Sequence, residues 1–189
     1  MNTRIAAIVT IAGVAAAANA DDLLLIDLSV VNQITISATS GLSSADVSGA
    51  DVTGVYFDNF YGGSGDSLSA TYQSGDISTF GDASDGSPAL FRAGAGADSG
   101  LNLFSWATAS TVSFTAGAQA FSGSATWALD ANEYANMLAG NTSGDLYFPA
   151  DDISDLAGAT AIGTWRVVPA PTGLAVLGLG GLVATRRRR

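Results

Sequence analysis

The chain has 189 residues, of which 48% are hydrophobic and only 13% charged, and this length suits one domain with short flanking segments. Residues 21–168 carry two Arg against seventeen acidic residues, a charge balance that repels phosphate and excludes nucleic acid as a partner. The absence of His, Cys and Lys excludes a Ser-His-Asp triad, a thiolate nucleophile, zinc held by His or Cys, and a Schiff-base lysine. Only carboxylates remain for acid–base chemistry.

Residues 1–20 have the three parts of a secretory signal peptide. Arg4 lies in a short positive start, residues 5–17 form an uncharged apolar run, and Ala18 and Ala20 place small side chains where signal peptidase needs them. The apolar run is shorter than the roughly 20 residues that span a bilayer. The sequence therefore predicts cleavage after Ala20 and export of the rest, with a buried N-terminal helix as the alternative.

The middle segment, residues 21–168, is rich in Gly, Ser, Thr and Ala and alternates apolar with polar residues, as strands do. Gly-rich turns separate the alternating runs. The predicted strands lie at residues 24–30, 34–39, 52–60, 68–73, 101–106, 112–116, 120–129 and 162–168. Short strands at this spacing favour an all-β fold, namely an antiparallel β-sandwich with a jelly roll as a variant.

One short helix is expected between the last two predicted strands. Asp130 is a good N-cap, Glu133 stands three residues later as in a capping box, and Gly140 can end the helix. A further short turn is expected at residues 151–156. Glu133, the only Glu of the chain, is thus interpreted as part of a helix cap.

The last segment, residues 169–189, is predicted to be a targeting and membrane-anchor segment and not part of the domain. Pro169-Ala170-Pro171 ends the final strand, because proline denies a backbone donor to the sheet. Residues 172–185 form an uncharged stretch that as a helix would rise about 21 Å, short of a bilayer core of about 30 Å. The terminal basic cluster would keep its own end cytoplasmic and the acidic domain outside; it consists of Arg186, Arg187, Arg188 and Arg189.

These features together resemble a PEP-CTERM sorting signal, although Ala170 stands where that family usually has Glu between the prolines. The resemblance covers about the last 21 residues and does not extend to the central domain. It implies an exported bacterial protein that a membrane-embedded exosortase processes, at the cell surface or in an extracellular, polysaccharide-rich biofilm matrix. The implied partners are signal peptidase, the exosortase and, at least transiently, the membrane. A nucleic-acid tail is the competing interpretation of the terminal arginines.

Two enzymatic hypotheses use the carboxylates. A glycosidase needs two acidic groups about 5 to 9.5 Å apart, and seventeen acidic residues leave that open. Asp98-Ser99-Gly100 matches an aspartic-protease triplet, but such enzymes pair two of these loops and the chain has one. The Gly-rich run 94–100 is better explained as a flexible turn than as a nucleotide loop. The sequence therefore predicts a protein without catalytic residues.

Calcium is the cofactor that the residue types allow, because hard oxygen ligands in loops suit Ca²⁺. The candidate ligands lie in two loops, Asp82 and Asp85 in one and Asp151, Asp152 and Asp155 in the other. Neither loop has the spacing of an EF-hand, and acidic loops also simply keep an exported protein soluble. No cofactor is therefore assigned, with calcium as the open alternative.

Aromatic residues are the remaining indication of binding. They are Tyr56, Phe57, Phe60, Tyr61, Tyr72, Trp106, Trp127 and Trp165, and on alternating strands such residues are more often core than ligand platform. We expect a non-catalytic structural or interaction role at the cell surface. The alternative is a carbohydrate-binding module for exopolysaccharide, which an exposed aromatic platform beside the Asp82–Asp85 loop would favour.

Overall fold

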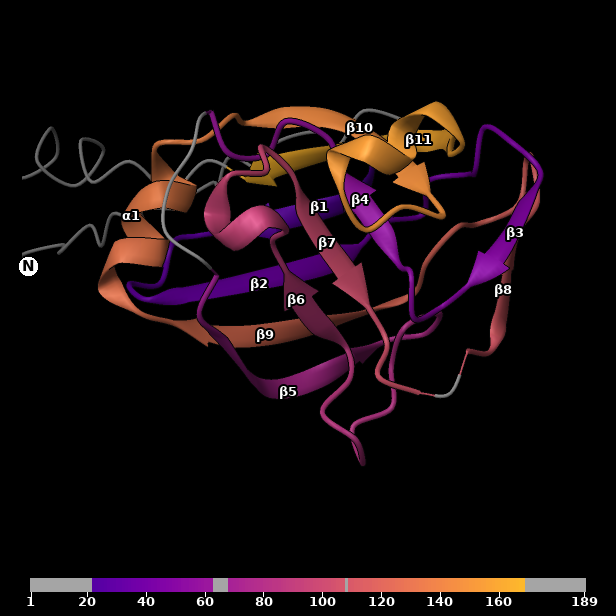
Figure 1. Ribbon diagram of the computed structural model, residues 1–189. Coiled ribbons are helices and arrows are strands. Elements are labelled where there is room, and N and C mark those ends of the chain that lie inside the picture. Colours follow the sequence, from indigo (N-terminus) through magenta and orange to yellow (C-terminus); the bar gives the residue numbers. More distant parts are fainter. Residues whose placement is uncertain (1–21, 63–67, 108, 169–189) are drawn as a thin grey trace, which may run out of the picture.

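The computed structural model describes residues 22–62, 68–107 and 109–168 (Figure 1). Within them the chain forms strands, one α-helix and two short 3₁₀ helices. In chain order these are β1 (Asp22–Asp27), β2 (Gln33–Ala38), β3 (Val47–Ala50), β4 (Val55–Phe57), β5 (Ala70–Ile77), β6 (Ala89–Phe91), η1 (Gly94–Gly96), β7 (Leu101–Phe104), β8 (Thr111–Phe114), β9 (Gly123–Leu129), α1 (Ala131–Leu138), β10 (Ser143–Phe148), η2 (Ile153–Ala157) and β11 (Thr160–Val168).

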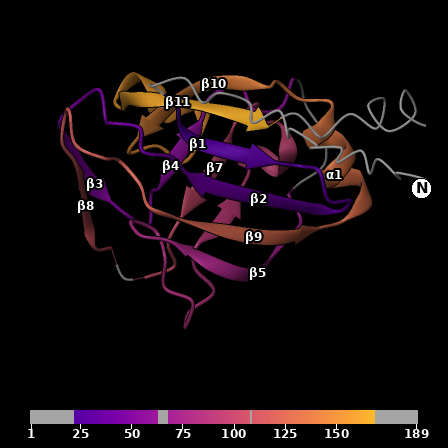
Figure 2. The same ribbon diagram turned by 180° about the vertical axis from the view of Figure 1, so that it is seen from behind.

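Nine of the strands form one curled sheet in the order β5-β9-β2-β1-β11-β10-β4-β7-β6. All neighbouring pairs are antiparallel except β1 and β11, which run parallel. In Figure 1 β7 and β6 lie in front of β1, β2 and β9, and Figure 2 shows the same two walls from behind. The outer strands β5 and β6 approach each other, so the sheet nearly closes into a barrel.

The β-rich fold with one short helix is confirmed, but the expected antiparallel two-sheet sandwich is corrected. Hydrogen bonding is continuous from β5 to β6 because the long β11 lies between β1 and β10 and pairs with both. The remaining two strands, β3 and β8, form a separate antiparallel pair at one end of the molecule (Figure 1). A parallel pair between the first and last strands leaves no trace in alternation or turn spacing, which report only local structure.

All eight predicted strands overlap observed ones, with shifted ends. The first ends early, at Asp27, and Val30 is exposed in the following turn. Three observed strands, β3, β6 and β10, were not predicted. Strand β10 begins Ser143-Gly144-Asp145, which is typical of a turn, yet it pairs with β11 on one side and β4 on the other.

The core fills the space between the two walls of the sheet and is aromatic in large part. Phe57, Phe60 and Trp165 form one cluster, with ring centroids 5.2 to 6.4 Å apart. Phe114 and Phe148 belong to a second, 5.0 Å apart and edge to face. The expectation that most aromatic residues are core is confirmed, because six of the eight candidates are buried: Tyr56, Phe57, Phe60, Tyr61, Trp127 and Trp165.

Helix α1 begins and ends close to its predicted bounds. The Asp130 side chain accepts a 2.8 Å hydrogen bond from the Glu133 backbone N–H, as expected of an N-cap. The Glu133 carboxylate is buried and accepts a 2.6 Å hydrogen bond from the Tyr61 hydroxyl. Glu133 therefore ties the helix to the core, a role that the capping pattern did not predict. The short turn expected at 151–156 is η2.

Among the residues that the structure describes, no helix has the length and apolar character needed to cross a membrane. The predicted signal peptide (1–20) and the predicted sorting segment (169–189), with its short membrane helix, lie outside the described residues.

Candidate binding site

Trp106 is the exposed tryptophan of the protein. Its exposed fraction is 61%, against 1% for Trp127 and 0% for Trp165. It follows β7, where its backbone N–H donates a 2.6 Å hydrogen bond to the Ser87 hydroxyl, and its indole packs edge to face on Phe104 with centroids 4.9 Å apart. Trp106 is therefore an apolar surface that is held in place and still open to solvent.

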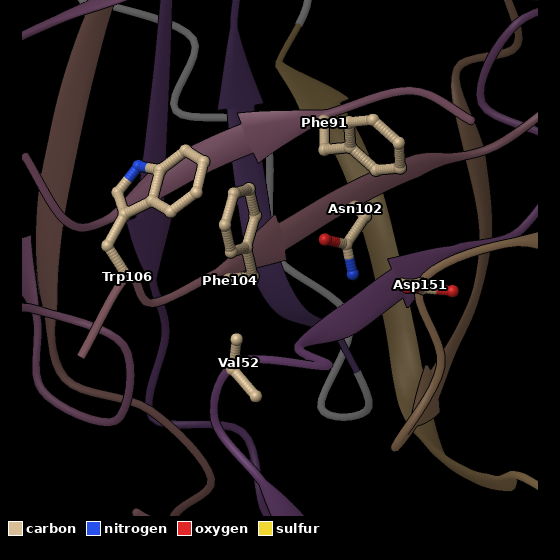
Figure 3. Close-up of a pocket in the computed structure, with 6 residues that line it drawn as sticks. All are labelled: Val52, Phe91, Asn102, Phe104, Trp106 and Asp151. Carbon is tan, nitrogen blue, oxygen red and sulfur yellow. The ribbon is translucent and has the colours of Figure 1, made fainter. Parts of the chain in front are cut away.

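A cavity of about 220 Å³ lies beside Trp106, on the outer face of β6 and β7 (Figure 3). Phe91 and Asn102 are paired across these strands, and Phe104 shares a face with Asn102 because side chains two apart on a strand do so. Phe91 and Phe104 meet edge to face at 6.5 Å. The lining residues are Val52, Phe91, Asn102, Phe104, Trp106 and Asp151; we call this cavity the aromatic pocket.

Asn102 is the polar group of the aromatic pocket, and its amide orientation is fixed. Its Nδ2 donates hydrogen bonds of 2.9 Å to the carbonyls of both Thr53 and Ala150. The opposite orientation would turn Oδ1 against those carbonyl oxygens, which cannot donate. Within the described part of the chain no hydrogen bond reaches the Oδ1 atom, and Figure 3 shows it on the Phe104 side of the pocket. A residue only 2% exposed thus offers a free acceptor to a ligand.

A second, smaller cavity of about 130 Å³ lies at the seam where β5 and β6 approach. Its lining residues are Ala70, Tyr72, Gly86, Ala89, Leu90, Trp106 and Trp127; we call it the seam pocket. Trp106 lines both pockets. Gly86 belongs to the Asp82–Asp85 loop region, so the exposed indole lies beside that loop.

The acidic residues considered for catalysis have structural partners. Asp98 is buried; its Oδ1 accepts hydrogen bonds from the Tyr56 hydroxyl and the Gly100 N–H, and its Oδ2 accepts one from the Ile153 N–H at 2.8 Å. Burial and the adjacent Asp98 raise the pKa of Tyr56. The Asp98-Ser99-Gly100 triplet therefore joins the β7 region to η2.

Arg92 lies at the centre of this buried polar region. Its Nε donates a 2.7 Å hydrogen bond to the Asp98 carbonyl, and its guanidinium carbon lies 3.7 Å from the Tyr61 ring centroid. Tyr61 in turn donates to Glu133, and burial together with the Glu133 charge raises the pKa of the Tyr61 hydroxyl. A cation, two phenols and two carboxylates thus form one network that is buried from solvent.

The two predicted calcium loops differ in geometry. Asp151, Asp152 and Asp155 each place a carboxylate oxygen within 4.8 Å of the others, a spacing that a hard cation could bridge. Carboxylates in both loops also accept local backbone hydrogen bonds, from the N–H groups of Ser84 and Ser87 at Asp82 and Asp85 and from that of Ser154 at Asp152. The three-aspartate cluster has the donor set for Ca²⁺, and exposed acidic groups are also common without an ion, so calcium stays the open alternative and no cofactor is assigned.

Asp151, which lines the aromatic pocket, is expected to destabilise the protein when it ionises. Burial and the neighbouring Asp155 and Asp152 raise its pKa above the usual 3.8. The folded state therefore binds the proton more tightly, and stability falls as pH rises through the raised pKa. Asp151→Asn should raise the free energy of unfolding at pH 7, by less than about 1 kcal/mol because solvent screens the site.

Urea unfolding at pH 7 and pH 4 checks this expectation: the gain should shrink at the lower pH. Asp152→Asn is the matched control of opposite sign, because hydrogen bonds from Ser154 lower the pKa of Asp152 and ionisation there is stabilising. A gain at Asp151 that does not change with pH would contradict the assignment.

No protein-family model, curated protein or solved structure matches the chain. The resemblance of residues 169–189 to a sorting signal therefore stays a prediction from the sequence motif.

The sequence pointed to Trp106 only as one of eight aromatic candidates, and it did not single out Phe91, Asn102 or Phe104. A signal was present: Asn102, Phe104 and Trp106 alternate with the apolar Leu101 and Leu103. The two leucines are fully buried in the core, so the other face of the strand, with its aromatic rings, had to point outward.

Proposed function

We propose that this is an exported, exosortase-sorted protein of the bacterial cell surface or extracellular matrix, in which the β domain has a non-catalytic interaction role. The export and sorting steps rest on residues 1–20 and 169–189 of the sequence. The interaction role rests on the domain, where the aromatic pocket is the contact site.

The observation that carries the interaction role is the exposure of Trp106 in a fold that buries the other two tryptophans. Contiguous exposed apolar surface marks binding sites, and the exposed side chains of Val52, Phe91 and Trp106 line the same pocket. Asn102 adds a fixed polar acceptor beside it. An apolar pocket with a few oriented polar groups is the usual form of a small-molecule or saccharide site.

A non-catalytic role is supported by the surroundings of the two carboxylates that a hydrolase would most need. Asp98 and Glu133 are buried, and their oxygens accept hydrogen bonds from Tyr56 and Tyr61. Neither carboxylate lines the aromatic pocket or the seam pocket.

Carbohydrate binding is the second candidate, as a specific form of the interaction role. The exposed Trp106 lies beside Gly86, next to the Asp82–Asp85 loop, the arrangement that favours a carbohydrate-binding module. Exopolysaccharide is the ligand that the predicted destination of the protein would supply.

The test is fractionation of a bacterial host that exports the protein, with wild type and Trp106→Ala compared. We expect both proteins outside the cytoplasm, with mass spectra that begin at Asp21. The wild type should remain with the insoluble matrix, and Trp106→Ala should be released several-fold more into the medium, because truncation of a central aromatic contact weakens binding.

Two results would contradict the proposal. Wild type found only in the cytosolic fraction, with Met1 still present, would rule out export. Equal retention of wild type and Trp106→Ala would show that the aromatic pocket is not the contact site.

A further inference from the structure

We propose that the aromatic pocket and the seam pocket are consecutive subsites for one chain of a neutral polysaccharide, with Trp106 between them; this rests on the interaction role proposed above. Trp106 lines both pockets. Volumes of about 220 and 130 Å³ are below the roughly 300–1,000 Å³ of sites for drug-sized ligands. Each pocket therefore suits a single small ring.

The chemistry of the aromatic pocket defines what such a ring must offer. Phe91 and Trp106 are 44% and 61% exposed and present apolar surface at the rim, and Phe104 lies deeper. The Asn102 Oδ1 is an acceptor at the pocket surface, and a ligand that covers it must supply a donor in place of water. A pyranose ring meets both requirements, because the C–H groups on its faces can pack on the aromatic rings and the hydroxyl groups on its edge can donate to Asn102.

The charge of the surroundings selects against acidic sugars. Asp151 lines the aromatic pocket, and Asp152 and Asp155 each place a carboxylate oxygen within 4.8 Å of an Asp151 oxygen. Residues 21–168 carry seventeen acidic residues and two Arg, both of which have structural partners. A uronate carboxylate would therefore be repelled by these carboxylates, whereas an uncharged sugar would not.

The seam pocket would hold a second sugar ring, next to the ring in the aromatic pocket. It is formed by β5, β6 and β9, through Tyr72, Leu90 and Trp127, and by Gly86. Because Trp106 is shared, a ligand that fills both pockets contacts the indole along its length. Two linked rings bind with one loss of translational freedom, so affinity should rise from one sugar unit to two.

The experiment uses the exported protein, wild type and Trp106→Ala, on a glycan array that carries neutral and uronate-containing oligosaccharides of one to six units. We expect signal on neutral glycans only, a marked increase from one unit to two or three, and at least about a tenfold loss of affinity in Trp106→Ala. Phe91→Ala should weaken binding as well. Leu138→Ala, at an exposed apolar position on α1 that lines neither pocket, is the matched control that should not.

Each other outcome overturns the inference. Equal signal on uronate glycans would remove the charge selection, and single sugars that bind as tightly as longer chains would remove the second subsite. No signal on any glycan, with a wild type that still fractionates with the matrix, would remove the saccharide and leave the interaction role standing. Concentration-dependent dimerisation abolished by Trp106→Ala would assign the pocket to a second copy of the chain.

Discussion

Replacing Arg92 with methionine is expected to lower the free energy of unfolding by about 3–5 kcal/mol, the cost of breaking a buried charged network. Arg92 is buried, donates to the Asp98 carbonyl and lies over the Tyr61 ring. Its loss would remove the cation that packs on the Tyr61 ring, whose hydroxyl donates to the buried Glu133 carboxylate, and methionine cannot replace the hydrogen bond to Asp98.

Denaturant unfolding measures this effect, with Leu90→Met as the matched control. Leu90 lies two residues away on β6 and is half-buried, and a volume-conserving apolar exchange costs less than about 1.5 kcal/mol. Similar losses in the two variants would contradict a specific role for the Arg92 charge.

Replacing Asn102 with aspartate is expected to cost about 2 kcal/mol or more at pH 7, although the two side chains have the same shape. The exchange removes the Nδ2 donor and sets an oxygen against the carbonyls of Thr53 and Ala150. Because the new carboxyl is buried among acceptors, its protonated form is favoured in the folded state. Stability should therefore recover as the pH is lowered through its raised pKa.

Asn141→Asp is the matched control for this exchange. Asn141 Nδ2 donates to the Asn59 carbonyl at 2.6 Å in a solvent-exposed position, where water can replace the lost bond and the cost should stay below about 1 kcal/mol. Equal losses in both variants, measured by denaturant unfolding at pH 7, would show that Asn102 does not hold the pocket region together.

The sequence predicted the local structure better than the topology. Alternation located β2 and β9 because their apolar residues face the core at every second position. The curling of the sheet and the parallel pairing of β1 with β11 depend on which strands meet, and Asp22 pairs with Thr164 across almost the whole domain. No periodicity within a strand carries that information.

The candidate site was predictable only in part for the same reason. Alternation with Leu101 and Leu103 indicates the side on which Trp106 lies, but the exposed fractions of 61% for Trp106 and 1% for Trp127 depend on what the fold packs against each ring. The amide orientation of Asn102 is fixed by hydrogen bonds to the carbonyls of Thr53 and Ala150, which are 49 and 48 residues away in the sequence. The local capping pattern predicted only a helix-cap role for Glu133. Its buried carboxylate also accepts a hydrogen bond from Tyr61, which lies in a loop distant in the sequence.

The contact between Trp106 and a saccharide is tested most directly by acrylamide quenching of tryptophan fluorescence. Since Trp127 and Trp165 are buried, the neutral quencher reports on Trp106. Saturation with the neutral oligosaccharide that gives the strongest array signal should lower the quenching constant, and Trp106→Phe should abolish that change. A quenching constant that stays the same at saturation would contradict the account, because the sugar would then be bound elsewhere.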